Sequence, residues 1–74
     1  MAYNILINEL DKICLEYGVR LINITFNIQN SADIEIDERP KETPKAFDNL
    51  EEELREKMNE MGFTMNDLFY KVYK

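Results

Sequence analysis

Two short segments in which apolar and polar side chains alternate constrain the fold of this chain more than any other feature. The first covers residues 20–29 and the second covers residues 33–38. A period of two residues indicates strands with one apolar face and one polar face. The residues between them, 29–32, are rich in turn-forming side chains, so the pair predicts an antiparallel β-hairpin. The side chains expected to face the core are Ile22, Ile24, Phe26, Ile28, Ile34 and Ile36.

A two-stranded hairpin is only marginally stable by itself, so helices are needed to cover its apolar face. Apolar residues at spacings of three and four predict one helix over about residues 3–17 and a second over about residues 47–61. Gly18 and Gly62 follow these segments directly, as expected of helix C-terminal stops.

The last segment predicts a third helix over about residues 64–73, because Thr64 and Asp67 have the spacing of an N-terminal cap. Residues 39–46 contain both prolines and predict a stiff, solvated connector. The expected fold is therefore α+β, a single domain over residues 1–74 in the order αββαα.

The composition argues against an enzyme. There is no histidine to act as a base, and the one cysteine, Cys14, lies on the apolar stripe of the first helix. Asp33, Glu35 and Asp37 have the spacing that opens an EF-hand loop, but Glu38 stands where that loop requires glycine. We therefore expect no catalytic residue, no cofactor and no metal site. An enzyme whose metal is held by carboxylates alone is the alternative, and it predicts tight binding of a divalent metal.

The chain also lacks the features of an exported or membrane protein. One cysteine cannot form an internal disulfide, and no apolar run approaches the roughly 20 residues that a membrane span requires. The first residues show no basic segment followed by an apolar one. These observations predict a cytoplasmic protein with no membrane contact.

Acidic residues outnumber basic ones, 15 to 9, and the excess gathers in two rows. The first row is on the polar face of the second predicted strand, and the second forms a ridge on the second predicted helix. Each row has an explanation without a binding role. Charges on the strand protect an exposed sheet edge against unwanted pairing, and the ridge on the helix is a solvated face. The alternative is that they dock on a basic surface, with Tyr70 as a further contact. The partner-binding candidates are Asp33, Glu35, Asp37, Glu52, Glu56, Glu60 and Tyr70.

The net charge of −6 disfavours direct binding of nucleic acid, because phosphate neutralisation supplies most of the affinity of such complexes. It suits a partner with a basic, nucleic-acid-handling surface. In size, acidity and layout the chain resembles the small acidic inhibitors that bacteriophages encode, including anti-CRISPR proteins and other DNA mimics. This resemblance implies a non-enzymatic inhibitor of a host protein such as a CRISPR nuclease, acting in the cytoplasm of a bacterial host cell.

A second hypothesis is a small structural or assembly module, whose acidity serves solubility. Such a module homodimerises or docks through apolar surface and through the strand edge that the first strand leaves free. It predicts sensitivity to changes at Ile5, Leu15 or Tyr70, which lie off the predicted apolar stripes.

Overall fold

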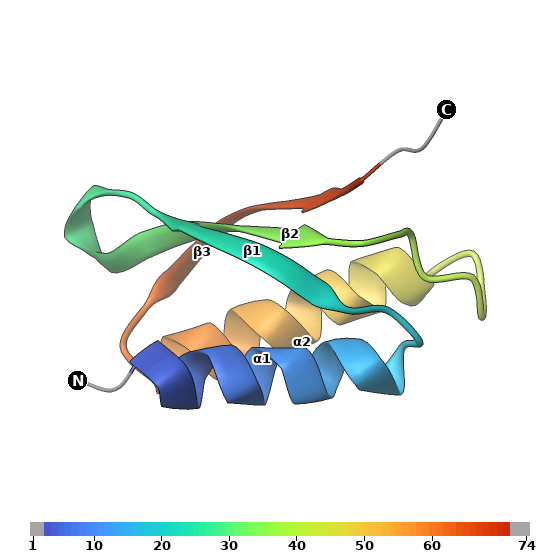
Figure 1. Cartoon of the computed structure of the whole chain (residues 1–74), viewed down its shortest axis with the longest axis horizontal. Helices are drawn as coiled ribbons and strands as arrows, with labels where there is room; N and C mark the ends of the chain where they lie inside the picture. Colours follow the sequence, from blue (N-terminus) through green and yellow to red (C-terminus); the bar gives the residue numbers. More distant parts are fainter. Residues whose placement is uncertain (1–2, 72–74) are drawn as a thin grey trace.

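The computed structural model describes residues 3–71 and has two layers, a three-stranded sheet and a pair of helices (Figure 1). In chain order the elements are α1 (Tyr3–Glu16), β1 (Leu21–Phe26), the 3₁₀ turn η1 (Ile28–Asn30), β2 (Ser31–Ile36), α2 (Ala46–Glu60) and β3 (Thr64–Tyr70). The α+β class predicted from the sequence is confirmed.

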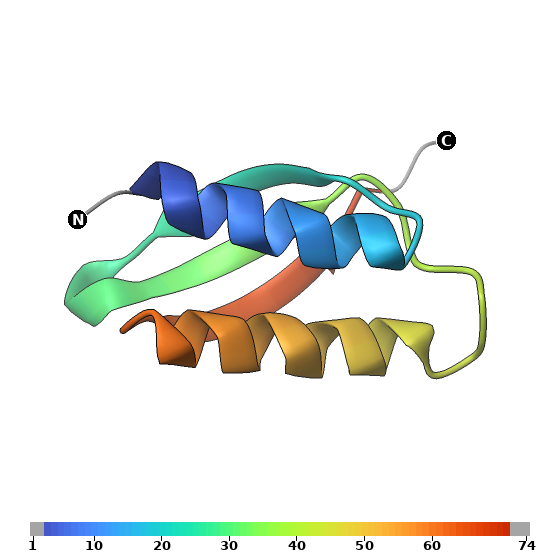
Figure 2. The same cartoon turned by 90° about the horizontal axis from the view of Figure 1, so that it is seen from below.

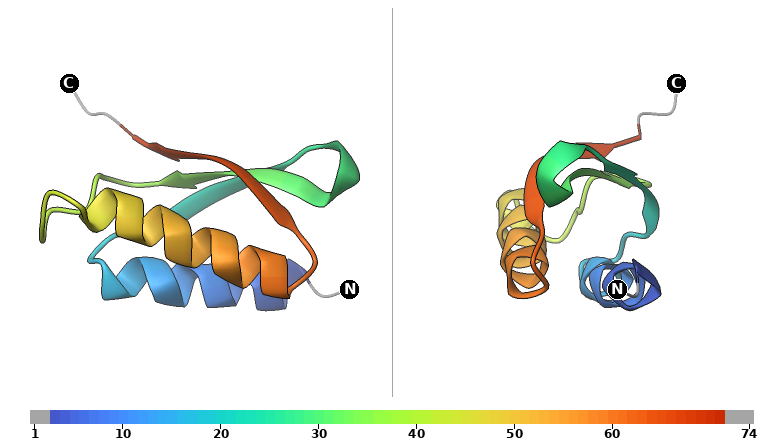
Figure 3. Two further views of the ribbon diagram at one scale, coloured as in Figure 1. Left: turned by 180° about the vertical axis from the view of Figure 1, so that it is seen from behind. Right: turned by 90° about the vertical axis from the view of Figure 1, so that its left-hand side faces the viewer.

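Strand β2 lies in the centre of the sheet, antiparallel to β1 and parallel to β3. Parallel neighbours need a long crossover connection, and α2 supplies it between β2 and β3. Both helices lie on the same face of the sheet, and no other element of residues 3–71 covers the opposite face (Figure 3). Seen from below, α1 and α2 run antiparallel and side by side (Figure 2).

The core lies between the helix pair and the inner face of the sheet. Each helix contributes three residues that are fully buried, and β2 contributes every second residue. These residues are Leu6, Leu10 and Cys14 from α1, Leu50, Leu54 and Met58 from α2, and Ala32, Ile34 and Ile36 from β2. The predicted stripes of the two helices and of β2 are confirmed at these positions, whereas Tyr3, where the predicted stripe of the first helix begins, is 50% exposed.

Both predicted helix stops are confirmed. Gly18 has φ +75° and Gly62 has φ +88°, in the left-handed region that side chains with a Cβ rarely adopt. Each glycine thus turns the chain out of its helix towards the strand that follows.

The predicted third helix over residues 64–73 is wrong, because Thr64–Tyr70 is strand β3 and the order of elements is αββαβ. Met65 and Leu68 are both buried, three residues apart, because the β2–β3 register shifts between Ala32 and Ile34. This bulge gives the strand an apolar spacing that imitates a helix. Pairing with β3 also satisfies the second edge of β2, which an isolated hairpin would leave open. Residues 72–74 lie outside the described residues.

Strand β1 is shorter than the predicted range of 20–29 and is irregular at its start. Its register with β2 shifts between Leu21 and Asn23, and Leu21 packs against the core while Ile22 is 45% exposed. The strand ends at Phe26, and the expected core residue Ile28 is 82% exposed in η1. The turn of η1 brings the chain into β2 two residues earlier than predicted, at Ser31.

Candidate interaction surfaces

The acidic row of β2 lies on the uncovered face of the sheet. Asp33, Glu35 and Asp37 alternate with the buried residues of the strand and therefore point away from the helices. All three are partly buried, because β2 has a neighbouring strand on each side. The structure thus places these three predicted binding residues together on one face.

Two of the three carboxylates accept hydrogen bonds from backbone N–H groups of the sheet and its connections. The backbone N–H of Asp67 in β3 donates to Asp33 Oδ1 at 3.2 Å. The backbone N–H of Arg20 donates to Asp37 Oδ1 at 2.8 Å. Glu35 stands in register with Asn23 on one side and Phe69 on the other. Aspartate is rare within strands, and the hydrogen bond from β3 gives Asp33 a structural role in β2. Asp37 follows the end of β2 and has a similar role towards the residue before β1.

The second acidic row belongs to a larger surface, which we call the acidic helix face. It surrounds a groove of about 320 Å³ between α1 and α2 and an adjoining hollow. The predicted ridge supplies three of its glutamates, and three more come from sequence positions that were not singled out as binding residues. The acidic helix face consists of Glu9, Glu16, Glu52, Glu53, Glu56 and Glu60, with Lys12 and Lys57 in the same groove.

The lysines neutralise only part of this surface. Lys12 pairs with Glu9 at 3.8 Å, and the half-buried Lys57 pairs with the exposed Glu60 at 3.9 Å. Such pairs are weak in water. The remaining carboxylates leave the groove with an excess of negative charge.

A hydrogen bond beside the acidic helix face links Tyr17, the residue after α1, to α2. The Tyr17 hydroxyl donates a hydrogen bond to Glu53 Oε2. This bond, with lesser contributions from desolvation and from the negative charges around it, raises the pKa of Tyr17 to about 12. The phenol is therefore protonated at neutral pH and acts as a donor to the carboxylate.

The two acidic rows lie on opposite sides of the molecule. The row of β2 is on the sheet face away from the helices, whereas Glu52 and Glu56 are about half a turn of α2 from the buried Leu54. A single flat partner surface cannot contact both rows at once. The candidate site therefore divides into two separate surfaces.

Tyr70, the remaining predicted contact, is placed apart from both acidic rows. Its ring meets the ring of Phe47 edge-on, with centroids 5.6 Å apart, and the guanidinium of Arg39 lies 5.9 Å from its centroid. Arg39 also stands 5.2 Å from the Phe47 ring. These contacts attach the end of β3 to α2 and the connector, which gives Tyr70 a packing role.

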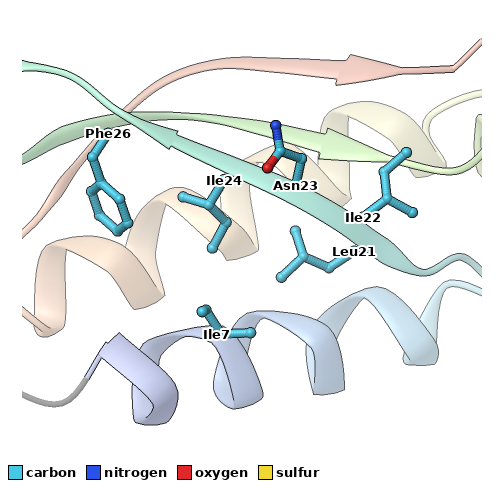
Figure 4. Close-up of a pocket in the computed structure, with 6 residues that line it drawn as sticks. All are labelled: Ile7, Leu21, Ile22, Asn23, Ile24 and Phe26. Atoms are coloured by element: carbon cyan, nitrogen blue, oxygen red, sulfur yellow. The ribbon is translucent and has the colours of Figure 1, made fainter.

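A third surface is largely apolar and lies along the edge of β1 that pairs with no strand in the described part of the chain. A groove of about 250 Å³ opens there between α1 and β1 (Figure 4). It is lined by Ile7, Leu21, Ile22, Asn23, Ile24 and Phe26. The sequence predicts this surface only as the unpaired edge of the first strand, and the lack of charged residues in β1 is a further signal for it. Ile5 and Leu15, named as off-stripe residues, are 56% and 51% exposed.

Cys14 is buried in the core, and its thiol is shielded from solvent. Burial raises the pKa of the Cys14 thiol to about 12, so it is protonated and unreactive at neutral pH. Within residues 3–71, no group of three or more acidic, histidine or cysteine side chains is arranged to hold a metal ion. No helix in this part of the chain is long and apolar enough to cross a membrane.

Comparison with known proteins adds one distant relative. The chain is 27% identical over 70 residues to an uncharacterized protein of Schizosaccharomyces pombe (strain 972). The match covers 93% of this chain but only 5% of the length of that protein. No protein-family model matches the chain, and no solved structure matches it.

Proposed function

We propose that this chain is a non-enzymatic interaction module that binds a basic, nucleic-acid-handling surface of a partner protein through its acidic helix face. The observation that carries this proposal is the gathering of six glutamates from two helices around one groove and its adjoining hollow, which together hold only two lysines. A surface with one sign of charge attracts the opposite sign and speeds association with it.

The arrangement on α2 has a cost in stability, which supports a role beyond solubility. Glu52, Glu56 and Glu60 follow one another at four-residue spacing, so like charges stack along the helix. Each such pair costs about 0.2 to 0.5 kcal/mol. The favourable pair between Glu51 and Arg55, at 3.8 Å, lies outside the acidic helix face.

The inhibitor role is the specific form of this proposal. If the basic surface of the partner is its nucleic-acid groove, a bound module excludes the nucleic acid, as expected of a protein that resembles phage-encoded DNA mimics. The proposed setting is then the cytoplasm of a bacterial host cell, and a CRISPR nuclease is one partner of the required chemistry. The acidic helix face alone carries this role, because the β2 row points the opposite way.

Two charge-matched variants test the proposal. One replaces three glutamates of the acidic helix face (Glu52→Gln, Glu56→Gln, Glu60→Gln), and the other replaces three glutamates outside it (Glu35→Gln, Glu38→Gln, Glu42→Gln). Wild type and both variants are immobilised and used to capture proteins from a bacterial lysate at low and high salt. We expect wild type and the second variant to retain a basic partner that high salt releases, and the first variant to lose it. Equal capture by both variants, or capture that salt does not affect, would refute the proposal.

A further inference from the structure

The outer edge of β1 lacks most of the protection that exposed strand edges normally carry. Natural proteins guard such edges with charges, prolines or bulges. Strand β1, with sequence LINITF, contains no charged residue and no proline. Its register with β2 shifts between Leu21 and Asn23 and is regular from Asn23 to Phe26. This regular part is the segment to which another strand can be added, and we call it the β1 edge.

The hydrogen-bond pattern identifies which backbone groups of the β1 edge are open. The N–H of Asn27, the next residue, donates to the carbonyl of Ser31 at 2.7 Å. Bonded and non-bonded pairs alternate in an antiparallel ladder, so Thr25 also directs its backbone groups towards β2. Ile24 and Phe26 direct theirs outward, where no strand of residues 3–71 lies. An added strand would pair with these two residues.

The two faces of an added strand would meet different surfaces. On the helix side lies the groove of about 250 Å³ in Figure 4, whose wall includes the partly exposed side chains of Ile7 and Phe26. On the uncovered side of the sheet, β1 presents Asn23 and Thr25, which are exposed, uncharged and joined by a side-chain hydrogen bond of 3.3 Å. Successive residues of a strand point to opposite faces, so every second side chain of the added strand would enter the apolar groove.

The acidic row of β2 gives the uncovered side of the sheet its charge. Asn23 stands opposite Glu35 and Thr25 stands opposite Asp33, so the two carboxylates lie directly behind the two uncharged side chains. Asp33 accepts a hydrogen bond from a backbone N–H. Glu35 is partly buried and has no hydrogen bond or ion pair with any other described residue. A carboxylate that is partly removed from water is stabilised by a cation placed beside it.

We propose that the β1 edge binds an extended segment of another protein in which apolar and basic residues alternate. The segment adds to the sheet as a further strand beside β1, and its apolar side chains enter the groove beside Ile7. Its lysine or arginine side chains lie over Asn23 and Thr25. Two strand spacings, about 10 Å, separate the segment from β2. A long basic side chain and the side chain of Glu35 together span that distance.

Charge selects this occupant over a second copy of the chain. Strands β1, β2 and β3 contain no lysine or arginine, so none of them can place a cation near Glu35 when added at the β1 edge. Two copies, each with a net charge of −6, also repel each other, whereas a basic segment is attracted. This inference is independent of the proposed function, because the β1 edge and the acidic helix face are different surfaces.

Fluorescence anisotropy with short labelled peptides tests the proposal. One peptide alternates valine and arginine, a second has the same residues in two blocks, and a third alternates valine and glutamate. We expect the first to bind with an affinity that salt lowers, and the other two to bind at least tenfold more weakly. Equal binding of the alternating and block peptides would overturn the proposal.

Two N-methylated forms of the first peptide test the pairing of the backbones. One is methylated at the valines and the other at the arginines. Only alternate amides of a strand face its neighbour, so one form should lose affinity at least tenfold and the other should retain it. Equal effects of the two methylations would contradict strand addition.

Matched charge reversals in the chain show where the alternating peptide binds. Glu35→Lys reverses the charge behind the β1 edge, and Glu56→Lys makes the same change on the acidic helix face. We expect Glu35→Lys to weaken binding at least tenfold and Glu56→Lys to change it by less than about twofold, with circular dichroism confirming that both are folded. The opposite order would place the peptide on the acidic helix face. That result would overturn this inference and leave the proposed function standing.

Amide hydrogen exchange locates the pairing without any substitution. The Ile24 and Phe26 amides should become protected when the alternating peptide binds, while the Thr25 amide, already bonded to β2, should change little. Protection confined to α1 and α2 would overturn the proposal. Sedimentation velocity of the chain alone tests the second copy as occupant, and a dimer that excludes the peptide would also overturn it.

Discussion

The backbone N–H of Asp67 donates a hydrogen bond to the side chain of Asp33, 3.2 Å away, at the point where the register of β2 and β3 shifts. The bulge places Asn66 and Asp67 opposite one residue of β2, so the regular ladder is interrupted there. The Asp33 carboxylate supplies an acceptor for the amide of Asp67 at this interruption.

Removing this acceptor should weaken the attachment of β3. Asp33→Ala leaves the Asp67 N–H without its protein partner and should lower the free energy of unfolding by about 1 kcal/mol. Asp33→Asn retains a side-chain oxygen and should cost less. Urea unfolding measures both, with Glu35→Ala as a control on the same face of the same strand. Equal stability of Asp33→Ala and Glu35→Ala would show that the hydrogen bond contributes nothing.

Neighbouring residues of β3 should differ sharply in their effect on stability. Leu68 is 8% exposed and faces the core, whereas Phe69 is 52% exposed on the uncovered face of the sheet. Leu68→Ala should lower the free energy of unfolding by about 2 to 3 kcal/mol, and Phe69→Ala by less than about 1 kcal/mol. A helix over 64–73 would bury both side chains on one stripe. Similar losses from the two substitutions, measured by urea unfolding, would therefore argue against the strand.

The contact between Tyr17 and Glu53 should appear in a pH titration. The pKa of Tyr17 is raised to about 12 chiefly because its hydroxyl donates to Glu53, and Glu53→Gln should lower that pKa towards its ordinary value of 10. Since the folded pKa exceeds the unfolded one, the contact stabilises the protein below pH 10 and loses its effect between about pH 10 and pH 12. Ultraviolet absorbance of tyrosinate, with Tyr17→Phe as the subtraction reference, measures the shift. An unchanged titration in Glu53→Gln would contradict the assigned cause.

Removing one charge from the centre of the ridge should stabilise the protein. Glu56 has Glu52 and Glu60 one turn away on either side, so Glu56→Gln relieves two like-charge pairs of about 0.2 to 0.5 kcal/mol each. Thermal unfolding at low salt should therefore give a higher midpoint for Glu56→Gln than for wild type, and high salt should reduce the difference. A lower midpoint would mean that Glu56 stabilises the fold instead of serving the acidic helix face.

Much of this fold follows from local patterns in the sequence. Residues close together in the sequence determine the buried stripes of α1 and α2 and the glycine stops that follow them. The same is true of the buried face of β2. Such short-range patterns specify which side of an element is buried. They do not specify which elements become neighbours in the sheet.

The features that depend on distant neighbours could not be predicted in this way. Strand β3 owes its pairing to β2, more than 30 residues earlier, and its bulge disguises the period of two. The same limit applies to the candidate site. Glu9 and Glu16 join the α2 ridge only because α1 packs beside α2, and the β2 row is separated from that ridge only because both helices cover one face.

Competition with nucleic acid for the captured partner tests the central claim most directly. A fluorescent DNA duplex is bound to that partner, and fluorescence anisotropy follows its release as the chain is added. Wild type and the Glu35→Gln, Glu38→Gln, Glu42→Gln variant should displace the duplex. The Glu52→Gln, Glu56→Gln, Glu60→Gln variant should require at least a tenfold higher concentration, equivalent to about 1.4 kcal/mol. If the duplex stays bound at saturating wild type, or if both variants displace it equally well, the acidic helix face does not occupy a nucleic-acid-binding surface.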